Sequence, residues 1–458
     1  MGKFTTRSHL EFVNLTGNII RIYGEDGDDY DWDDAEDGKD LRPDRNFREV
    51  EIQPFQRALR DCETSNAAGI ATIHMRITNV TGEAKDTWAL FSGDQKNAFA
   101  SGKGIFGTVQ FEKANPPGFI IYQVAHSSFN RFLVVPSESL ANWMSRVEGS
   151  RDLFELIIPG THGSACLADG GGSKKDWTQD KKSTIWSQLA VGIRAFDLRF
   201  ESIEGVEGKK GDIISVHGVN DVKYSPQKIF KEIFDFLQSH PSEFVFARIR
   251  GNADVAPKLW EAFVSGGATA DFVYGAIPGA DGNHGHITNL WPNNLDGCRG
   301  KLLIQTEGSL KDSLGGLESP GWSDNTSDQT IRSGGVEGLP TVVRAIRVQD
   351  NHTFAAGTRT KKWNLITAML RNQETSDKYS KWYFNFLNAS GNHDPKYWAK
   401  GEDDDWGMNR RLLNYWAENT FYTSGIMWMD YYDEPEGLRA LVAIMAAMNS
   451  ETNKHSVR

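Results

Sequence analysis

Two histidines and one arginine stand at the ends of apolar runs in the middle of the chain. His162 follows a Pro-Gly-Thr turn, Arg199 ends a Phe-Asp-Leu-Arg run, and His217 comes directly before a glycine. Together these residue types can cut a phosphodiester without a metal ion. One imidazole removes a proton from the attacking oxygen, the other protonates the leaving oxygen, and a guanidinium binds the phosphoryl group between them. The sequence therefore indicates phosphodiester chemistry.

Length and charge limit the partners of this chain. Its 458 residues are too many for one ordinary core, but they fit one barrel of about 250 to 300 residues and a smaller domain. A net charge of -11 without a basic cluster argues against nucleic acid. No run of about 18 apolar residues is present, so we expect no transmembrane span. We expect contact with a membrane surface to be peripheral and apolar, aromatic or ion-mediated.

Neither the cysteines nor the first residues decide in which cellular compartment the protein works. Cys62, Cys166 and Cys298 form an odd set without metal-ligand spacing, which argues against a disulfide framework and a zinc site. We expect buried free thiols, although one disulfide remains an alternative. The first residues lack the apolar core of a signal peptide, but the mature form of a secreted protein would look the same.

Residues 1–138 show short apolar or alternating runs separated by Gly, Asn and Asp, as at 70–75 and 131–135. This spacing predicts an antiparallel β-sandwich that serves as an accessory domain. Within it, the segment 25–44 is densely acidic. This segment fits a solvated loop. The alternative is a calcium loop, because carboxylates at alternate positions suit a hard cation.

From residue 139 to 458 apolar runs alternate with helical stretches, which is typical of parallel β/α units. The pattern predicts an α/β domain with a TIM-like (β/α)8 barrel, because about eight strands close such a barrel. The predicted strands are Leu153–Ile158, Ala195–Phe200, Asp212–Val216, Phe244–Ile249, Lys301–Gln305, Thr341–Val348, Tyr383–Leu387 and Gly425–Met429. Helices are predicted over Pro226–Ser239 and Leu438–Met448.

A polar residue follows each predicted strand. In chain order these residues are His162, Glu201, His217, Arg250, Glu307, Asp350, Asn388 and Asp430. Because the βα loops of a barrel converge on one mouth, we expect these side chains to share a single active face.

Six ordered blocks carry a resemblance to a known family. They cover residues 157–162, 192–199, 216–218, 241–243, 348–350 and 428–431. A lone His-Gly or Phe-Asp pair would carry no weight, whereas six blocks in the same order are specific. From about Leu140 to Asp433 the chain resembles the bacterial-type phosphatidylinositol-specific phospholipase C family, including its fungal secreted relatives.

The resemblance implies a distorted β/α barrel that cleaves phosphatidylinositol, or a related phospholipid, through inositol 1,2-cyclic phosphate with release of diacylglycerol. It implies that His162 is the general base on the inositol 2-hydroxyl and that Asp430 fixes its tautomer. It further implies that His217 protonates the diacylglycerol oxygen and that Arg199 binds the phosphoryl oxygens. Asp197 matches an active-site carboxylate of the family.

Four further residues fall where the family binds the head group. By resemblance, Arg250 and Asp350 match inositol-hydroxyl ligands, and His352 lies where the family often has an aromatic ring. Glu307 stands where the family pattern has a basic ligand, and its carboxylate would disfavour extra phosphates on the ring. We expect no cofactor or metal, because a basic Arg199 argues against the calcium-dependent variant of the family.

One departure leaves the acid side of the site incomplete. The residue after the first histidine is normally aspartate in the bacterial type, but here it is Gly163. General acid catalysis contributes about 10²- to 10⁴-fold to a rate, so its loss would slow turnover strongly. The alternative therefore remains that the chain is a catalytically impaired lipid-binding or membrane-targeting protein. A third reading, a metal-dependent glycerophosphodiesterase or sphingomyelinase D-like barrel, needs carboxylate ligands near His162, and residues 163–166 offer none.

Overall fold

The structure is a computed structural model of the chain. It describes residues 6–25, 30–33, 40–41, 50–64, 70–78, 84–92, 105–108, 119–126, 129–136, 140–203, 212–265, 271–278, 285–318, 321–355, 357–375, 381–402, 405–419, 423–434 and 439–449. Most N-terminal strands are described by their backbone alone. Most of the acidic segment 25–44 lies outside the described part, apart from the backbone of residues 25, 30–33 and 40–41, so neither the solvated-loop nor the calcium-loop alternative is tested. The side chain of Cys62 also lies outside the described part.

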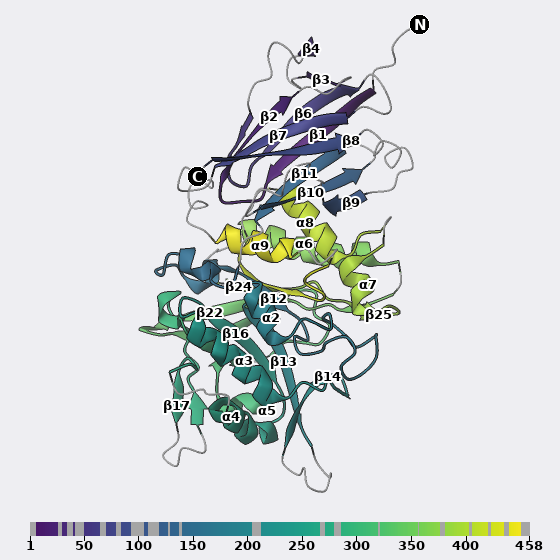
Figure 1. The fold of residues 1–458 in the computed structure, drawn as a ribbon. Helices are drawn as coiled ribbons and strands as arrows, with labels where there is room; N and C mark the ends of the chain where they lie inside the picture. Colours follow the sequence, from purple (N-terminus) through teal and green to yellow (C-terminus); the bar gives the residue numbers. More distant parts are fainter. Residues whose placement is uncertain are drawn as a thin grey trace.

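The described N-terminal strands form two sheets (Figure 1). The larger sheet contains, in spatial order, β4 (Asp40–Leu41), β3 (Tyr30–Asp33), β6 (Arg57–Thr64), β1 (Thr6–Asn14), β11 (Phe129–Pro136), β10 (Phe119–His126) and β9 (Ile105–Thr108). The smaller contains β5 (Val50–Ile52), β2 (Ile19–Glu25), β7 (Ile70–Thr78) and β8 (Ala84–Ser92). The expectation of antiparallel strands fails at one pair. β1 and β11 run parallel, with Phe12 opposite Phe132. They are far apart in the chain, so no short hairpin forces them to be antiparallel.

The second part of the chain is a curled mixed sheet. In spatial order its main path is β20 (Leu317–Glu318), β19 (Leu302–Thr306), β16 (Val245–Arg250), β13 (Ala195–Ser202), β12 (Ile157–Thr161), β26 (Gly425–Met429), β24 (Lys381–Phe386), β22 (Leu339–Gln349) and β21 (Gln329–Val336). Along this path the described strands pair in parallel, except that β21 is antiparallel to β22. The strands β12, β19 and β26 are buried along their whole length. Burial on both faces explains their continuous apolar runs, and the architecture is an α/β TIM-like barrel.

One predicted barrel strand is wrong. The run at 212–216 is β14 (Ile213–His217), which pairs antiparallel with β13 and with β15 (Asn220–Asp221). The connection from Ser202 to Ile213 is shorter than the dozen or so residues that a parallel crossover needs. The strand predicted at 153–158 also begins late, because Leu153–Glu155 forms the 3₁₀ helix η3 and β12 starts at Ile157.

Helices accompany the barrel strands. They are α2 (Ile185–Ala190), α3 (Pro226–Ser239), α4 (Ala256–Ser265), α5 (Gly308–Leu314), α6 (Arg359–Thr375), α7 (Pro395–Lys400), α8 (Met408–Glu418) and α9 (Ala440–Met448). Shorter elements are η2 (Trp143–Arg146), η4 (Ala253–Val255), η5 (Asp296–Cys298), β17 (Ala276–Pro278), β18 (Gly285–Ile287), β23 (Thr353–Phe354) and β25 (Ser390–Gly391). Within the described ranges, no helix has the length and apolar character needed to cross a bilayer.

The helix α3 has the predicted bounds because its start is encoded locally. Ser225 accepts a hydrogen bond from the Lys228 N–H, and Pro226 fits the first turn, where its missing N–H costs nothing. The apolar face of α3 is buried against the sheet and consists of Ile229, Phe230, Ile233, Phe234 and Leu237. The helix α9 starts at Ala440, two residues after its predicted start.

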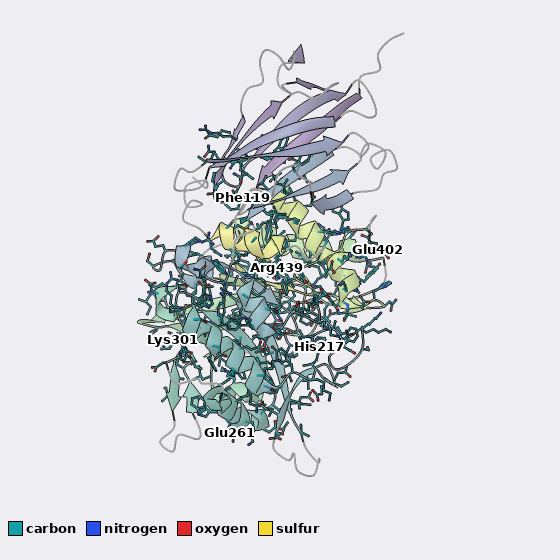
Figure 2. The ribbon with its side chains drawn as sticks, in the orientation of Figure 1. Phe119, His217, Glu261, Lys301, Glu402 and Arg439 are labelled. Atoms are coloured by element: carbon teal, nitrogen blue, oxygen red, sulfur yellow. The ribbon has the colours of Figure 1, made fainter. Side chains whose placement is uncertain are left out.

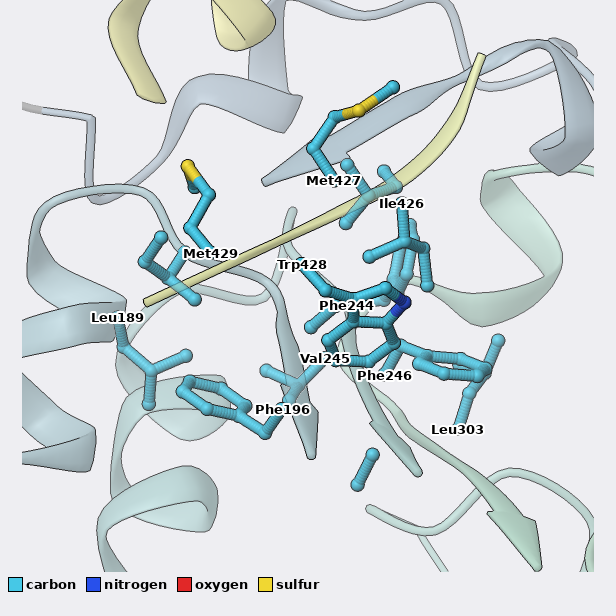
Figure 3. Packing of buried hydrophobic residues seen from close by; sticks show 14 of the residues in the cluster. Leu189, Phe196, Phe244, Val245, Phe246, Leu303, Ile426, Met427, Trp428 and Met429 are labelled. Atoms are coloured by element: carbon cyan, nitrogen blue, oxygen red, sulfur yellow. The ribbon is translucent and has the colours of Figure 1, made fainter. Parts of the chain in front are cut away.

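Aromatic rings fill the interior of the barrel. Trp428 of β26 stacks on Phe386 of β24, with ring centroids 5.4 Å apart, and packs against Phe246 of β16 at 6.4 Å. Figure 3 shows Trp428 and Phe246 together with Phe196 of β13. Because these side chains are buried, the barrel has a packed core and not a pore. Cys166 and Cys298 are buried free thiols, as predicted.

The N-terminal sheets rest on the barrel through its last helices. In Figure 1, α8 and α9 lie between the barrel strands and the N-terminal strands, and α9 contacts both β11 and β12. Arg131 of β11 donates hydrogen bonds to Glu11 of β1 and to Asn414 of α8. The boundary between the two parts is therefore both packed and hydrogen-bonded.

Candidate active site

The first histidine directly follows β12. The His162 N–H donates to the Met429 carbonyl at 3.0 Å, and its own carbonyl accepts from Gln179 Nε2 at 3.1 Å. Its Nδ1 lies 2.8 Å from Asp430 Oδ1, and its Nε2 lies 2.9 Å from Arg199 Nη2. Because a guanidinium only donates, Nε2 carries the lone pair, and the ring proton on Nδ1 is donated to Asp430. Burial and then Arg199 hold the pKa of His162 well below its usual value, so this ring is neutral at neutral pH.

Asp430 is buried directly after β26. Its Oδ1 accepts from His162, whereas its buried Oδ2 has no hydrogen-bond partner among the described residues. Burial raises the pKa of Asp430 well above its usual value, and the charges of Arg199 and Lys362 oppose this rise. The ionised state of this carboxylate therefore depends on the cations around it.

Asp197 and Arg199 are two residues apart on β13, so their side chains lie on the same face of the sheet. Arg199 Nη2 donates to Asp197 Oδ2 at 2.8 Å, and the Gly163 N–H donates to the same oxygen at 3.2 Å. The other oxygen, Oδ1, lies 3.3 Å from Arg248 Nη1. Burial acts to raise the pKa of Asp197, but Arg199 and Arg248 outweigh it and hold this pKa well below its usual range. Asp197 is thus an anion that orients Arg199.

The second histidine ends β14 and stands close to the first. The rings of His162 and His217 have centroids 5.4 Å apart and planes inclined by 76°. Figure 2 shows His217 on the barrel, away from the N-terminal sheets. Burial and then Arg199 lower the pKa of His217 to about 4, while Asp197 and Asp176 act to raise it. An anionic phosphate bound at the guanidinium would raise this pKa, because a negative charge favours the imidazolium.

Gly163 lies beside the second histidine in space. Its φ of +50° is in the left-handed region that favours glycine. A Cβ at this position would lie 3.1 Å from His217 Cδ2 and 2.9 Å from Thr178 Oγ1. A side chain at position 163 would therefore reach the ring of His217, where a carboxylate that supports the acid would have to stand.

A cavity of about 790 Å³ opens at the ends of β13 and β16. Arg250 and Glu307 line it, with Arg250 Nε and Glu307 Oε2 3.9 Å apart. Trp322 also lines the cavity, and its Nε1 donates to Asp350 Oδ2 at 2.9 Å. His352 Nδ1 lies 3.7 Å from Asp350 Oδ1, and this pairing raises the pKa of His352. The structure thus brings two of the predicted head-group residues into the cavity and connects the other two to its wall.

Sequence reasoning missed Arg248, Trp322 and Lys362. Arg248 Nε donates to Glu307 Oε1 at 2.7 Å, and its guanidinium carbon lies 3.9 Å from the Trp322 ring centroid. Because Arg248 neutralises Glu307, it offsets the repulsion of ring phosphates that the sequence predicts for this carboxylate. Its only sequence signal is its place two residues before Arg250 in an apolar strand. Trp322 and Lys362 carry no comparable signal.

The remaining polar residues at strand ends do not form a metal centre. Glu201 lines the cavity, and Asn388 is buried. Among the described side chains, no group of three or more His, Cys, Asp or Glu residues could hold a metal ion.

Part of the chain is similar in sequence to known bacterial enzymes. No family model matches the chain. It is 24% identical over 283 residues to a 1-phosphatidylinositol phosphodiesterase of Staphylococcus aureus, covering 59% of this chain and 80% of that protein. The same enzyme from a second strain gives 24% identity and 76% coverage of its length.

Solved structures show the fold. Two structures of the phosphatidylinositol-specific phospholipase C of S. aureus superpose with TM-scores of 0.51 and 0.50 at 20% identity. The first covers 69% of this chain and 99% of the solved chain, the second 68% and 98%. The chain therefore resembles the bacterial phosphatidylinositol-specific phospholipases C, as its motifs predicted, and it contains an α/β barrel of their fold.

Proposed function

We propose that this chain is a phosphodiesterase of the phospholipase C type, which cleaves phosphatidylinositol by metal-independent acid–base catalysis with two histidines. One observation carries the proposal. The lone pair of His162 Nε2 faces the guanidinium of Arg199, and the ring of His217 stands 5.4 Å from that of His162. This arrangement supports the proposal, because the proposed anion-binding cation and the proposed acid both lie next to the proposed base. Similarity to enzymes named 1-phosphatidylinositol phosphodiesterase supports the same reaction class.

In the proposed first step the phosphodiester draws Arg199 away from His162. The Nε2 of His162 then takes the proton of the inositol 2-hydroxyl, whose oxygen bonds to phosphorus, while Asp430 holds the Nδ1–H. His217 gives its proton to the glycerol oxygen as the bond from that oxygen to phosphorus breaks. Asp197 keeps Arg199 oriented towards the phosphoryl oxygens. The products are diacylglycerol and inositol 1,2-cyclic phosphate, which water opens in a second step.

The cavity beside Arg199 is the proposed site of the head group. Arg250 and Glu307 offer hydrogen bonds to ring hydroxyls from its wall, and Asp350 with His352 would do so from its rim. A fixed guanidinium fork suits a polyol, because it presents several donors in one plane.

We further propose that residues 1–138 are a β-sandwich accessory domain and residues 139–458 the catalytic domain. The two N-terminal sheets and the change to parallel strands after residue 138 support this division. The accessory domain would help the barrel to reach phosphatidylinositol at a membrane surface as a peripheral protein. The mature form of a secreted protein would suit this role.

Cleavage of phosphatidylinositol vesicles in the presence of a chelator tests the function. We expect the chain to release inositol cyclic phosphate, and His162→Ala to lose about 10²- to 10⁴-fold in rate, the usual worth of a general base. His286→Ala, which removes an exposed histidine of β18, is the matched control and should keep full activity. Equal rates for both variants, or no product from the unchanged chain, would contradict the proposal.

A second candidate follows from Gly163, because this position contributes no carboxylate beside His217. The chain would then be a catalytically impaired protein that binds phospholipid at a membrane surface. Binding to phosphatidylinositol vesicles without product, in the chain and in Gly163→Asp alike, would favour this candidate over the enzyme.

A further inference from the structure

A buried arginine lies between the proposed phosphate-binding residues and the head-group cavity. Arg248 belongs to β16, and its side chain is only 2% exposed. Its guanidinium carbon lies 3.9 Å from the centroid of the Trp322 ring and 5.8 Å from that of the Phe386 ring. A guanidinium that is removed from water in this way destabilises the fold unless carboxylates compensate its charge and accept its hydrogen bonds.

Two carboxylates compensate the charge of Arg248. Its Nε donates to Glu307 Oε1 at 2.7 Å, and its Nη1 lies 3.3 Å from Asp197 Oδ1. In the strand register, Arg248 of β16 is opposite Asp197 of β13. On its other side it is opposite Gln305 of β19, and Glu307 stands two residues later in the chain. One guanidinium can serve both carboxylates at once, because its five donors lie along several edges of a rigid plane.

The second oxygen of each carboxylate faces a different half of the site. Asp197 Oδ2 accepts from Arg199 Nη2 at 2.8 Å, on the side of the proposed phosphate ligand. Glu307 Oε2 lies 3.9 Å from Arg250 Nε, and both of these side chains line the cavity. Five groups of alternating charge therefore form one row, in the order Arg199, Asp197, Arg248, Glu307 and Arg250.

The two ends of this row are accessible, whereas its centre is buried. The side chains of Arg199 and Arg250 are 20% and 46% exposed. Those of Asp197 and Arg248 are 0% and 2% exposed. Arg248 is thus too buried to bind a phosphate itself, and it can act on the substrate only through the two carboxylates that it contacts.

We propose that Arg248 is a positioning residue that joins the phosphate-binding half of this site to its head-group half. It holds Asp197, which orients Arg199 towards the phosphoryl group. It also holds Glu307 by one oxygen, so that the other oxygen is presented to a hydroxyl of the head group. The inference rests on the proposed function, because both halves act in the same reaction.

Turnover of phosphatidylinositol vesicles, with kcat and KM measured separately, provides the first test. Asp197→Asn should mainly lower kcat and Glu307→Gln should mainly raise KM, because each variant loosens one half of the site. Arg248→Met removes both contacts, so it should lower kcat about 10- to 10²-fold and also raise KM about 2- to 10-fold. Arg248→Lys keeps the charge without the planar fork, so it should recover stability but not kcat. Arg332→Met, at an exposed position of β21, is the matched control and should change neither value.

Double-mutant cycles in urea unfolding at neutral pH test the same contacts without turnover. Arg248→Met should be non-additive with Asp197→Asn and, separately, with Glu307→Gln, because each double variant removes both partners of one contact. Arg248→Lys takes the place of Arg248→Met in both cycles if the latter does not fold. Additivity in either cycle overturns the inference, as do an unchanged kcat and KM in an active Arg248→Met chain or full recovery of both by Arg248→Lys. If the unchanged chain yields no product, the proposed function fails, and the cycles still decide whether Arg248 joins the two carboxylates.

Discussion

At the scale of single residues, Arg199 connects the two histidines. Its Nη2 contacts both His162 Nε2 and Asp197 Oδ2, and its charge contributes to the lowered pKa of His162 and of His217. A bound phosphate would neutralise this charge, so both pKa values would rise together. In the proposed reaction, the bound phosphate would therefore make His162 a stronger base and favour the protonated form of His217.

Gly163→Asp should move the alkaline limb of the pH profile. Burial and Arg199 lower the pKa of His217 to about 4. In the proposed reaction this residue acts as an acid only when protonated, so kcat/KM should decline as pH rises above that value. A carboxylate at position 163 would raise the pKa of His217 and shift this decline to higher pH. The measurement is kcat/KM for phosphatidylinositol cleavage between pH 4 and pH 9.

Gly163→Ala is the matched control for this change. It shares the strained φ of +50° and the Cβ contact of 2.9 Å with Thr178 Oγ1, but it has no carboxylate. Both variants should lose about 1 to 3 kcal/mol of unfolding free energy from the left-handed backbone. An alkaline limb that shifts equally in both variants would show that the carboxylate has no electrostatic effect on His217.

At the scale of elements, two of the sequence blocks turn out to hold strands in place. Arg194 precedes β13, Glu243 precedes β16, and both are fully buried. Arg194 Nε and Nη2 lie 2.9 and 2.8 Å from Glu243 Oε2. The remaining guanidinium donors go to the carbonyls of Leu140, Ala141, Leu189 and Ile193. This pair fixes the starts of two neighbouring strands and so sets where Arg199 and Arg250 emerge at their other ends.

Arg194→Met should cost about 3 to 5 kcal/mol of unfolding free energy, because it leaves the Glu243 carboxylate buried without its partner. Urea denaturation measures this loss. Arg347→Met breaks the more exposed pair with Asp328 and should cost no more than about 1 kcal/mol. Similar small losses in both variants would mean that the Arg194 pair does not hold the strands.

At the scale of the whole molecule, the barrel and the N-terminal sheets share one buried cluster. Val13, Leu133 and Val135 of the N-terminal strands belong to the same cluster as Leu140 and Trp143 at the start of the barrel. The helices α8 and α9 complete this boundary (Figure 1). Two units with a common core should unfold together.

Leu133→Ala should therefore lower the stability of the whole chain and not of the N-terminal part alone. Removing this buried side chain should cost about 2 to 5 kcal/mol, with one transition at the same urea midpoint by far-UV circular dichroism and by loss of activity. Leu339→Ala, at an exposed position of β22, should stay within about 0.5 kcal/mol. Two separate transitions, with only the first one shifted, would show that the two parts fold independently.

Local sequence signals fixed several elements in advance. The strand β26 and the helix α3 have the predicted bounds, because a glycine at the start of the strand and a Ser-Pro cap at the start of the helix are local signals. The run that forms β14 is predicted as a barrel strand, because an apolar run does not indicate which strand it pairs with. Nor could the parallel pairing of β1 with β11 be read from neighbours along the chain.

The sequence by itself indicated that polar groups such as His162, Arg250 and Asp430 gather at one end of the barrel, since the ends of parallel barrel strands converge there. His217 reaches the same region from β14, which is antiparallel to β13. The sequence named His162, His217 and Arg199, and their catalytic roles remain predictions. Only the tertiary structure decided the charge state of each group. His162 and Asp430 are 268 residues apart along the chain, yet His162 Nδ1 lies 2.8 Å from Asp430 Oδ1 in a buried site. These pKa values depend on burial and on charged groups that are distant along the chain but close in space. A local pattern of residues predicts neither.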